Sequence, residues 1–297
     1  MIDLLIYGIR GEYLATISSL LYAITLISIR AGMAGGTPFA ALLTVNTIVS
    51  IGGLTVAAIR GTLFSTALAP VLWFVVTGIC AQGIGTLTHY FGIERMGVSR
   101  ATAVQSITPL WGVLFAFVVL GERPGIAVIS GTVAIVAGVV LLSLPEKRFE
   151  EGGWVQRAVL FPLVSSVVYA FVPIFAKFAF AYQQTPVLGL GVAFGSASIV
   201  MFLVRRKIPG GGVIQANSRS FGFFVLAGVM NMVGAIIYWS ALVAGSVSTI
   251  LPISRLYPLW VLVLGALFLG RMEKISIRVV LAGVIVVFGG VLITIYQ

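Results

Sequence analysis

The chain has 297 residues, of which 60% are hydrophobic and only 9% are charged, and its formal net charge is +10. A soluble domain carries about 25% charged residues, so this composition excludes a soluble protein and predicts a multi-pass membrane protein. Basic residues at helix ends face anionic headgroups, so we expect no nucleic-acid partner. The single cysteine, Cys80, excludes a disulfide framework and a cysteine-rich metal site.

Taken in chain order, apolar runs of about 18 or more residues predict ten membrane-spanning helices. These runs cover residues 12–30, 37–59, 68–92, 98–120, 124–144, 157–178, 186–204, 219–242, 247–269 and 276–296. The hydrophilic segment PEKRFEEGGW, residues 145–154, lies near the middle of the chain. The sequence therefore predicts an all-α integral membrane protein with a first five-helix repeat at 1–145, a linker at 146–156 and a second five-helix repeat at 157–297.

Short motifs recur along the chain at a nearly constant distance, which indicates an internal duplication. SSLLYA at 18–23 matches SSVVYA at 165–170 with an offset of 147, and PLW at 109–111 matches PLW at 258–260 with an offset of 149. Five helices per copy is an odd number, so the second copy enters the membrane from the opposite side, as an inverted-topology repeat. Such repeats are common in secondary transporters, although duplication can also produce a purely structural bundle.

Polar and small residues recur in the third and eighth helices, and each set falls on one face of an α-helix. At the offset of 149, Gln82 pairs with Asn231 and Gly85 with Gly234. Amide side chains at mid-span either line a central cavity or hold helices together. The two faces comprise Gly78, Gln82, Gly85 and His89, and Ala227, Asn231, Gly234 and Tyr238.

Proline occurs inside the fourth and ninth helices at equivalent positions, Pro109 and Pro258. Proline lacks an amide donor and clashes with the carbonyl four residues back. The carbonyls of Gln105 and Ser254 should therefore be freed, and both helices should kink. Kinks at matched depth are candidate hinges for opening one side and closing the other, although membrane helices also tolerate prolines without such a role.

Arg255 lies about eight residues into its predicted helix, roughly 12 Å from that end and close to the membrane midplane. Arginine there costs at least about 2.5 kcal/mol and needs a partner. All eight acidic residues fall in predicted loops or at helix ends. The remaining partners are freed carbonyls or tyrosine hydroxyls, cavity water, and a carboxylate or phosphate of a substrate, which guanidinium binds well. A snorkelling or carbonyl-bound structural arginine is the alternative.

Further polar and aromatic residues complete the candidate site. His89 is a candidate for proton coupling because histidine titrates near neutral pH, or it is a hydrogen-bonded interface residue. Asn46 either lines the cavity or clamps a neighbouring helix, and Trp239 flanks Tyr238 as a cavity wall. The candidate substrate-binding residues are Arg255, Gln82, Asn231, Tyr22, Tyr169, Gln105, Tyr238, Trp239 and Asn46.

Two stretches carry a resemblance to a known family, which extends over essentially the whole chain. The first, from Tyr90 to Gly125, reads YFGIERMGVSRATAVQSITPLWGVLFAFVVLGERPG. It resembles the EamA repeat of the drug/metabolite transporter superfamily in its mid-helix proline and the Leu-Gly-Glu that follows. The second reads SVSTILPISRLYPLWVLVLGALFLGRMEK, with Arg271 in place of the glutamate. The resemblance implies both termini in the cytoplasm, whereas the distribution of Lys and Arg places both outside.

The sequence therefore predicts a secondary-active transporter or exporter that moves a small anionic or zwitterionic metabolite by alternating access, and the resemblance puts amino acids first. The alternative is a broad-specificity exporter, or an uptake carrier, of cationic or aromatic small molecules of drug or choline type. One histidine, one cysteine and no mid-span carboxylate argue against an enzyme, so we expect no catalytic residue, metal or cofactor. Expected partners are the substrate, the lipid of the cell membrane and a candidate coupling proton, with the chain a monomer or weak dimer.

Overall fold

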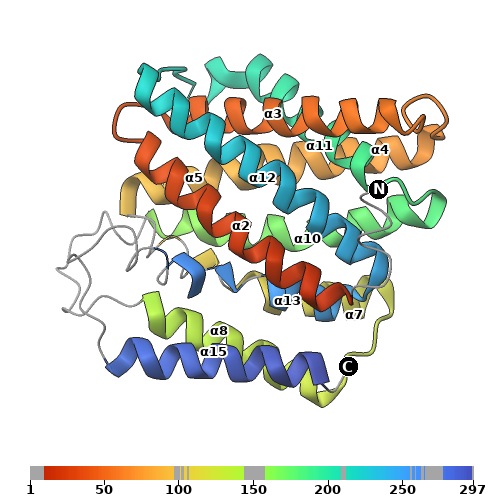
Figure 1. The fold of residues 1–297 in the computed structure, drawn as a ribbon, viewed down its shortest axis with the longest axis vertical. Coiled ribbons are helices and arrows are strands. Elements are labelled where there is room, and N and C mark those ends of the chain that lie inside the picture. The colour runs from red at the N-terminus through yellow and green to blue at the C-terminus, as the bar shows by residue number, and fades with distance from the viewer. Residues whose placement is uncertain are drawn as a thin grey trace.

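The computed structural model describes residues 10–96, 101, 104–105, 107–143, 158–208, 212–254, 256–257, 259–261, 264 and 277–295. Every regular element within these ranges is a helix (Figure 1). The elements are α2 (Gly11–Gly32), α3 (Pro38–Ile59), α4 (Leu68–Thr77), the π-helix η1 (Gly78–Gly85), α5 (Thr86–Met96), α7 (Thr108–Leu120), α8 (Ile126–Ser143), α10 (Leu160–Tyr182), α11 (Pro186–Val204), the 3₁₀ turn η2 (Arg205–Lys207), α12 (Ser218–Ala244), α13 (Val247–Ser254) and α15 (Ile277–Ile295).

Six helical segments in the described part of the chain are long and apolar enough to cross a membrane. They are Gly11–Gly32, Pro38–Ile59, Leu68–Arg95, Leu160–Tyr182, Pro186–Lys207 and Ser218–Ala244. The predicted all-α membrane architecture is confirmed to this extent. The count of ten helices and the inverted repeat stay predictions, because parts of the fourth, ninth and tenth predicted spans lie outside the described residues.

Local capping explains why two of the predicted spans begin within one residue of the observed helices. Thr37 precedes α3, and its hydroxyl accepts a hydrogen bond from the amide of Ala40 at 3.3 Å. Asn217 precedes α12 in the same way, with its Oδ1 accepting from the amide of Ser220 at 2.8 Å. Such caps satisfy amides that the first helical turn leaves without partners, so they fix where a helix starts.

The helices pair reciprocally between the two predicted repeats. Helix α2 packs along α12, while α10 packs along the continuous α4–η1–α5 segment. Helix α3 packs on α11, and α8 and α15 lie side by side at one edge of the bundle, apart from the other helices (Figure 1). In each case a helix from one half contacts a helix from the other half, so the two halves interlock rather than form separate domains.

The fourth and ninth predicted spans both change from helix to a tight turn at the same relative position. In one, the Ile107 amide donates to the Val104 carbonyl at 3.3 Å, and in the other the Leu256 amide donates to the Ile253 carbonyl at 3.1 Å. These pairs are related by the offset of 149. Helix α7 then begins at Thr108 with Pro109 in its first turn, and the Thr108 hydroxyl donates to the Gln105 carbonyl at 2.6 Å. Pro258 lies outside the described residues, and the hinge role of both prolines stays a prediction.

Glycines set the contact between α8 and α15. A Cβ placed on Gly289 would lie 2.6 Å from the carbonyl oxygen of Gly131, and one on Gly131 would lie 2.7 Å from the carbonyl oxygen of Gly289. Two turns further along, a Cβ on Gly138 would lie 2.9 Å from the Ala282 carbonyl oxygen. Small residues thus let the two backbones touch, which is how membrane helices associate where apolar burial offers no advantage over lipid.

This contact predicts a difference between two adjacent glycines of α15. We expect Gly289→Ala to destabilise the protein by about 1–3 kcal/mol, because its methyl group meets backbone that has no room to move. Gly290→Ala is the matched control, since its Cβ would meet only Leu256, at 3.9 Å. Thermal melting of the two purified variants in detergent checks the prediction, and equal melting temperatures would contradict it.

Candidate functional site

A cavity of about 90 Å³ lies at the centre of the bundle, where α2, η1, α10, α11, α12 and α13 meet. It is lined by Ser18, Tyr22, Gln82, Tyr169, Val172, Phe194, Asn231, Gly234, Ala235, Tyr238, Trp239 and Ser254. These residues come from both predicted repeats. The cavity therefore lies between the two halves of the chain rather than within either.

The cavity lies near the middle of the helices that surround it. Gln82 is fourteen residues from either end of the continuous helical segment that runs from Leu68 to Met96. Asn231 is thirteen residues from either end of α12. At 1.5 Å per residue, both amides lie roughly 20 Å from the ends of their helices. A polar cavity at this depth is where inverted-repeat transporters bind their substrates.

Two matching hydrogen bonds pin the halves together beside the cavity. The hydroxyl of Ser18 donates to the Gly234 carbonyl at 2.9 Å, and the hydroxyl of Ser165 donates to the Gly85 carbonyl at 2.9 Å. Each serine opens the repeated SS-x-x-YA motif, and the two glycines are the pair related by the offset of 149. Each bond therefore joins the first helix of one predicted repeat to the third span of the other.

The glycines at these bonds favour the close approach of the helices. A Cβ on Gly234 would lie 3.1 Å from Cβ of Leu21, and one on Gly85 would lie 3.3 Å from Cγ1 of Val168. Leu21 and Val168 are again equivalent positions of the repeated motif, three residues after each serine. The same local geometry is thus built twice, which the motif repeat alone did not reveal.

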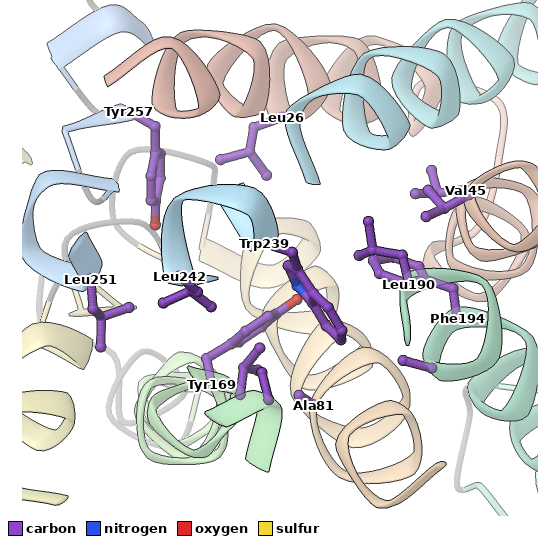
Figure 2. Packing of buried hydrophobic residues seen from close by; sticks show 14 of the residues in the cluster. Leu26, Val45, Ala81, Tyr169, Leu190, Phe194, Trp239, Leu242, Leu251 and Tyr257 are labelled. Carbon is purple, nitrogen blue, oxygen red and sulfur yellow. The ribbon is translucent and has the colours of Figure 1, made fainter. Parts of the chain in front are cut away.

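Aromatic side chains form much of the cavity wall and are held rigidly. Figure 2 shows Tyr169 reaching from α10 toward Trp239 on α12. Trp239 is only 2% exposed, and its ring packs against those of Phe74 and Phe180 at centroid distances of 5.7 and 6.1 Å. The Tyr169 hydroxyl is fixed by the Thr86 hydroxyl at 2.6 Å. The wall thus presents preorganised aromatic faces to the cavity.

Six of the nine predicted substrate-binding residues line this cavity. They are Tyr22, Gln82, Tyr169, Asn231, Tyr238 and Trp239. Arg255 lies outside the described residues, although Ser254, which precedes it, lines the cavity. None of the described lining residues carries a charge.

Gln105 and Asn46 do not line the cavity, and instead form hydrogen bonds with the helices that surround it. Gln105 is fully buried; its Nε2 donates to the Ser165 hydroxyl at 3.0 Å, and its Oε1 accepts from the Tyr257 hydroxyl at 2.9 Å. Asn46 is 1% exposed, and its Nδ2 donates to the backbone carbonyl of Gln82 at 3.1 Å. Both residues fit the reading of an amide that holds helices together.

A π-helix changes the predicted face of the third span. Between Gly78 and Gly85 the backbone bonds run from residue i to i+5, so each turn holds more residues than an α-helix. The predicted face assumed α-helical spacing throughout. As observed, Gln82 lines the cavity, whereas His89 is fully buried in α5 and does not line it. The role of His89 in proton coupling stays a prediction.

Other lining residues were missed because their types carry no sequence signal. Val172, Phe194 and Ala235 are apolar residues in apolar helices, so nothing separates them from packing positions. Ser18 had a signal, since it opens the repeated motif, but a serine in a membrane helix usually bonds its own backbone. Its partner, the Gly234 carbonyl, is 216 residues away.

At one end of the bundle, two charged side chains, Glu122 and Lys177, bond to backbone groups of Gly245, Val247 and Ser248. We call these five residues the Glu122 latch. The two carboxylate oxygens of Glu122 accept hydrogen bonds from the amides of Val247 and Ser248, each at 3.0 Å. Lys177 donates from Nζ to the Gly245 carbonyl at 2.8 Å. The carboxylate thus caps the start of α13, and the ammonium caps the end of α12.

The opposite end of the bundle lacks the same residues. At the offset of 147, Lys177 corresponds to Arg30, which is exposed at the end of α2. At the offset of 149, Glu122 corresponds to Arg271, which lies outside the described residues and whose side chain has no acceptor atom. Among the described residues, the latch therefore occurs at the end where α2 begins and α7 ends.

Removal of the Glu122 carboxylate should make the buried residues at this end of the bundle more accessible to solvent. The reporter is Ile250→Cys in a Cys80→Ala background, because Ile250 is fully buried against Gly245 near the latch. We expect Glu122→Ala to speed alkylation of this cysteine by a membrane-impermeant maleimide roughly two- to thirtyfold, since a lost helix cap costs about 0.5–2 kcal/mol.

The control for this measurement is Glu94→Ala, which removes an exposed carboxylate from the opposite end of the bundle. Its alkylation rate should equal that of the parent. Glu122→Gln keeps one acceptor oxygen and should give a smaller increase than Glu122→Ala. An unchanged rate in Glu122→Ala would show that the latch does not close this end.

Comparisons with known proteins give a family, a similar transporter and a similar fold. The chain matches the family described as the EamA-like transporter family twice, over residues 9–144 and 156–296. A protein of Clostridium kluyveri described as an uncharacterized transporter is 25% identical over 228 residues, which is 74% of this chain and 71% of that protein. A solved structure described only as a crystal structure of a protein has a TM-score of 0.79, with 18% identity, 97% of this chain and 99% of that chain covered. At that identity the likeness shows the fold alone.

Proposed function

Because the chain belongs to the EamA-like transporter family and is a multi-pass protein of the cell membrane, we propose that it is a secondary-active transporter of a small anionic or zwitterionic metabolite. Transport proceeds by alternating access between two repeats of opposite orientation, 1–145 and 157–297. Amino acids are the first substrates to test. In this proposal the protein is a transporter rather than an enzyme.

The observation that carries the proposal is the paired serine-to-glycine hydrogen bonding around the central cavity. Equivalent residues of the two halves form equivalent bonds, Ser18 with Gly234 and Ser165 with Gly85, both at 2.9 Å. The cavity between them is polar at Gln82 and Asn231 and lies at mid-depth. A cavity at mid-depth between two repeats is the arrangement typical of transporters that work by alternating access.

The Glu122 latch supports the second element of the proposal, a difference between the two ends. The latch joins α7, from the first repeat, to the start of α13, from the second. A state closed at this end keeps the latch formed. A state open at this end has to break two charge-assisted hydrogen bonds, so the latch biases the equilibrium between the two states.

Arg255 is the proposed partner for the negative group of the substrate. The described wall of the cavity carries no charge, so an anion in this cavity needs a cation from elsewhere. Arg255 follows a lining residue directly in the sequence. Its guanidinium suits a carboxylate or a phosphate through paired hydrogen bonds.

A second candidate function rests on the aromatic wall. Tyr22, Tyr169, Tyr238, Trp239 and Phe194 line a small cavity whose described residues include no acid. Aromatic faces attract cations and stack with aromatic ligands. This lining favours the alternative, a broad-specificity carrier of cationic or aromatic small molecules of drug or choline type.

Counterflow uptake into proteoliposomes separates the two functions. We expect counterflow with an amino acid or a phosphorylated sugar and none with choline. Arg255→Ala should abolish it, because the negative group loses its partner, while the folded yield stays unchanged. Arg206→Ala is the control, since Arg206 is exposed in η2 away from the cavity.

The opposite result identifies the alternative function. Counterflow with choline or aromatic cations alone, unchanged in Arg255→Ala and lost in Trp239→Leu, would replace the anion proposal by the cation carrier. Unchanged amino-acid or sugar-phosphate counterflow in Arg255→Ala would remove Arg255 from the site while leaving the transporter class in place.

A further inference from the structure

A second hollow lies on the outer surface of the bundle, between α7 and α8. Its volume is about 510 Å³, and it is lined by Leu110, Val113, Leu114, Phe117, Arg123, Pro124, Ile129, Thr132 and Val133. None of these residues lines the central cavity. The groove is therefore separate from the proposed transport site, and its contents do not depend on what the protein transports.

The groove exists because the two helices turn their small residues away from each other. On α7, Gly112 meets the side chain of Leu251 on α13, and on α8, Gly131 meets Gly289 on α15. The facing sides carry large apolar side chains that no other helix of the described ranges covers. Leu114, Phe117 and Val133 are 47%, 56% and 51% exposed on the protein surface.

The groove has two polar side chains, Thr132 and Arg123, and the charge lies at one end. The Thr132 hydroxyl donates to the Val128 carbonyl at 2.6 Å, so its hydrogen bond stays within α8. Arg123 lies in the short connection between Leu120, the last residue of α7, and Ile126, the first of α8, and it is exposed. The groove is thus an apolar channel with a cation at its rim.

Arg123 has no carboxylate partner among the residues that the structure describes. The adjacent carboxylate, that of Glu122, points inward to the amides of Val247 and Ser248. The ion pair present in the described ranges is that of Arg10 with Glu12. An exposed guanidinium at the end of a membrane helix binds a phosphate group well, because paired donors match its oxygens.

The length of the groove matches one leaflet. From Leu110 to Leu120, α7 advances ten residues, which is about 15 Å at 1.5 Å per residue. That is about half of the roughly 30 Å hydrocarbon core. An acyl chain that starts at the headgroup level beside Arg123 therefore reaches the membrane midplane at the far end of the groove.

We propose that the α7–α8 groove is a binding site for an anionic glycerophospholipid, with an acyl chain along Leu114, Phe117 and Val133 and the headgroup phosphate on Arg123. A basic residue beside a hydrophobic cleft at headgroup depth recognises lipid charge and chain together. The lipid contacts the end of α7 that carries Glu122, so it lies against the helix that forms the latch.

Photolabelling of the purified full-length protein tests the proposal. The probe is phosphatidylglycerol with a diazirine in one acyl chain, and peptides from α7 and α8 are quantified by mass spectrometry. We expect labelling concentrated on residues 110–133. Arg123→Gln should lower it roughly fivefold, the factor that one basic residue near an anionic headgroup contributes. Val133→Trp should lower it by filling the groove.

Two controls match these variants. Arg206→Gln removes an exposed arginine from the opposite end, and Val284→Trp enlarges a lipid-facing residue of α15 that does not line the groove. Both should keep full labelling at 110–133. The diazirine analogues of phosphatidylcholine and of a free fatty acid should label the groove less than phosphatidylglycerol does.

Three results would overturn the proposal. Equal labelling by phosphatidylcholine or by the fatty acid would remove the headgroup recognition. Labelling unchanged in Arg123→Gln would remove the arginine. A native mass spectrum of a lipid-free dimer that Val133→Trp converts to monomer would show that a second copy of the chain covers the groove instead.

Discussion

Two serine hydroxyl to glycine carbonyl hydrogen bonds determine how the halves of this protein meet. A bilayer core offers no bulk water, so a hydroxyl within it has to find a partner in the protein. Ser18 and Ser165 find theirs on the opposite half, at glycine carbonyls where an added Cβ would contact the facing helix tightly. The bonds hold α2 against α12 and α10 against η1, and the central cavity is the space left between these two contacts.

Gln105 and Asn46 extend this frame outward. Gln105 bonds to Ser165, which bonds to Gly85, and Asn46 bonds to the Gln82 carbonyl, so the backbone around the cavity is held from several sides. Each bond gives a partner to a polar group that would otherwise be unsatisfied in the membrane interior. These hydrogen bonds therefore connect the helices around the cavity at mid-depth.

The two ends of the bundle differ in their charged residues, and the helix contacts at its edge differ in how closely they pack. At one end a carboxylate and an ammonium bond to backbone groups of residues 245–248. At the edge, α8 and α15 pack through glycines, whereas α7 and α8 diverge and leave an apolar groove. A helix that turns its small residues toward one neighbour presents bulky residues to the other side, so tight packing at one contact creates the hollow next to it.

The sequence by itself determined the class, the positions of the six long apolar helices of the described residues and the matching of the repeated motifs. Bilayer thickness imposes a length on each apolar run, and caps such as Thr37 and Asn217 mark where helices begin, so local information suffices. The offsets of 147 and 149 likewise identified Tyr22, Tyr169, Gln82 and Asn231, which line one cavity. Only the tertiary structure decided that Gly78–Gly85 is a π-helix, that His89 is buried away from the cavity, and that Gln105 braces it. The role of Gln105 depends on a partner far along the chain, the Tyr257 hydroxyl 152 residues away, and helical periodicity contains no information about such partners.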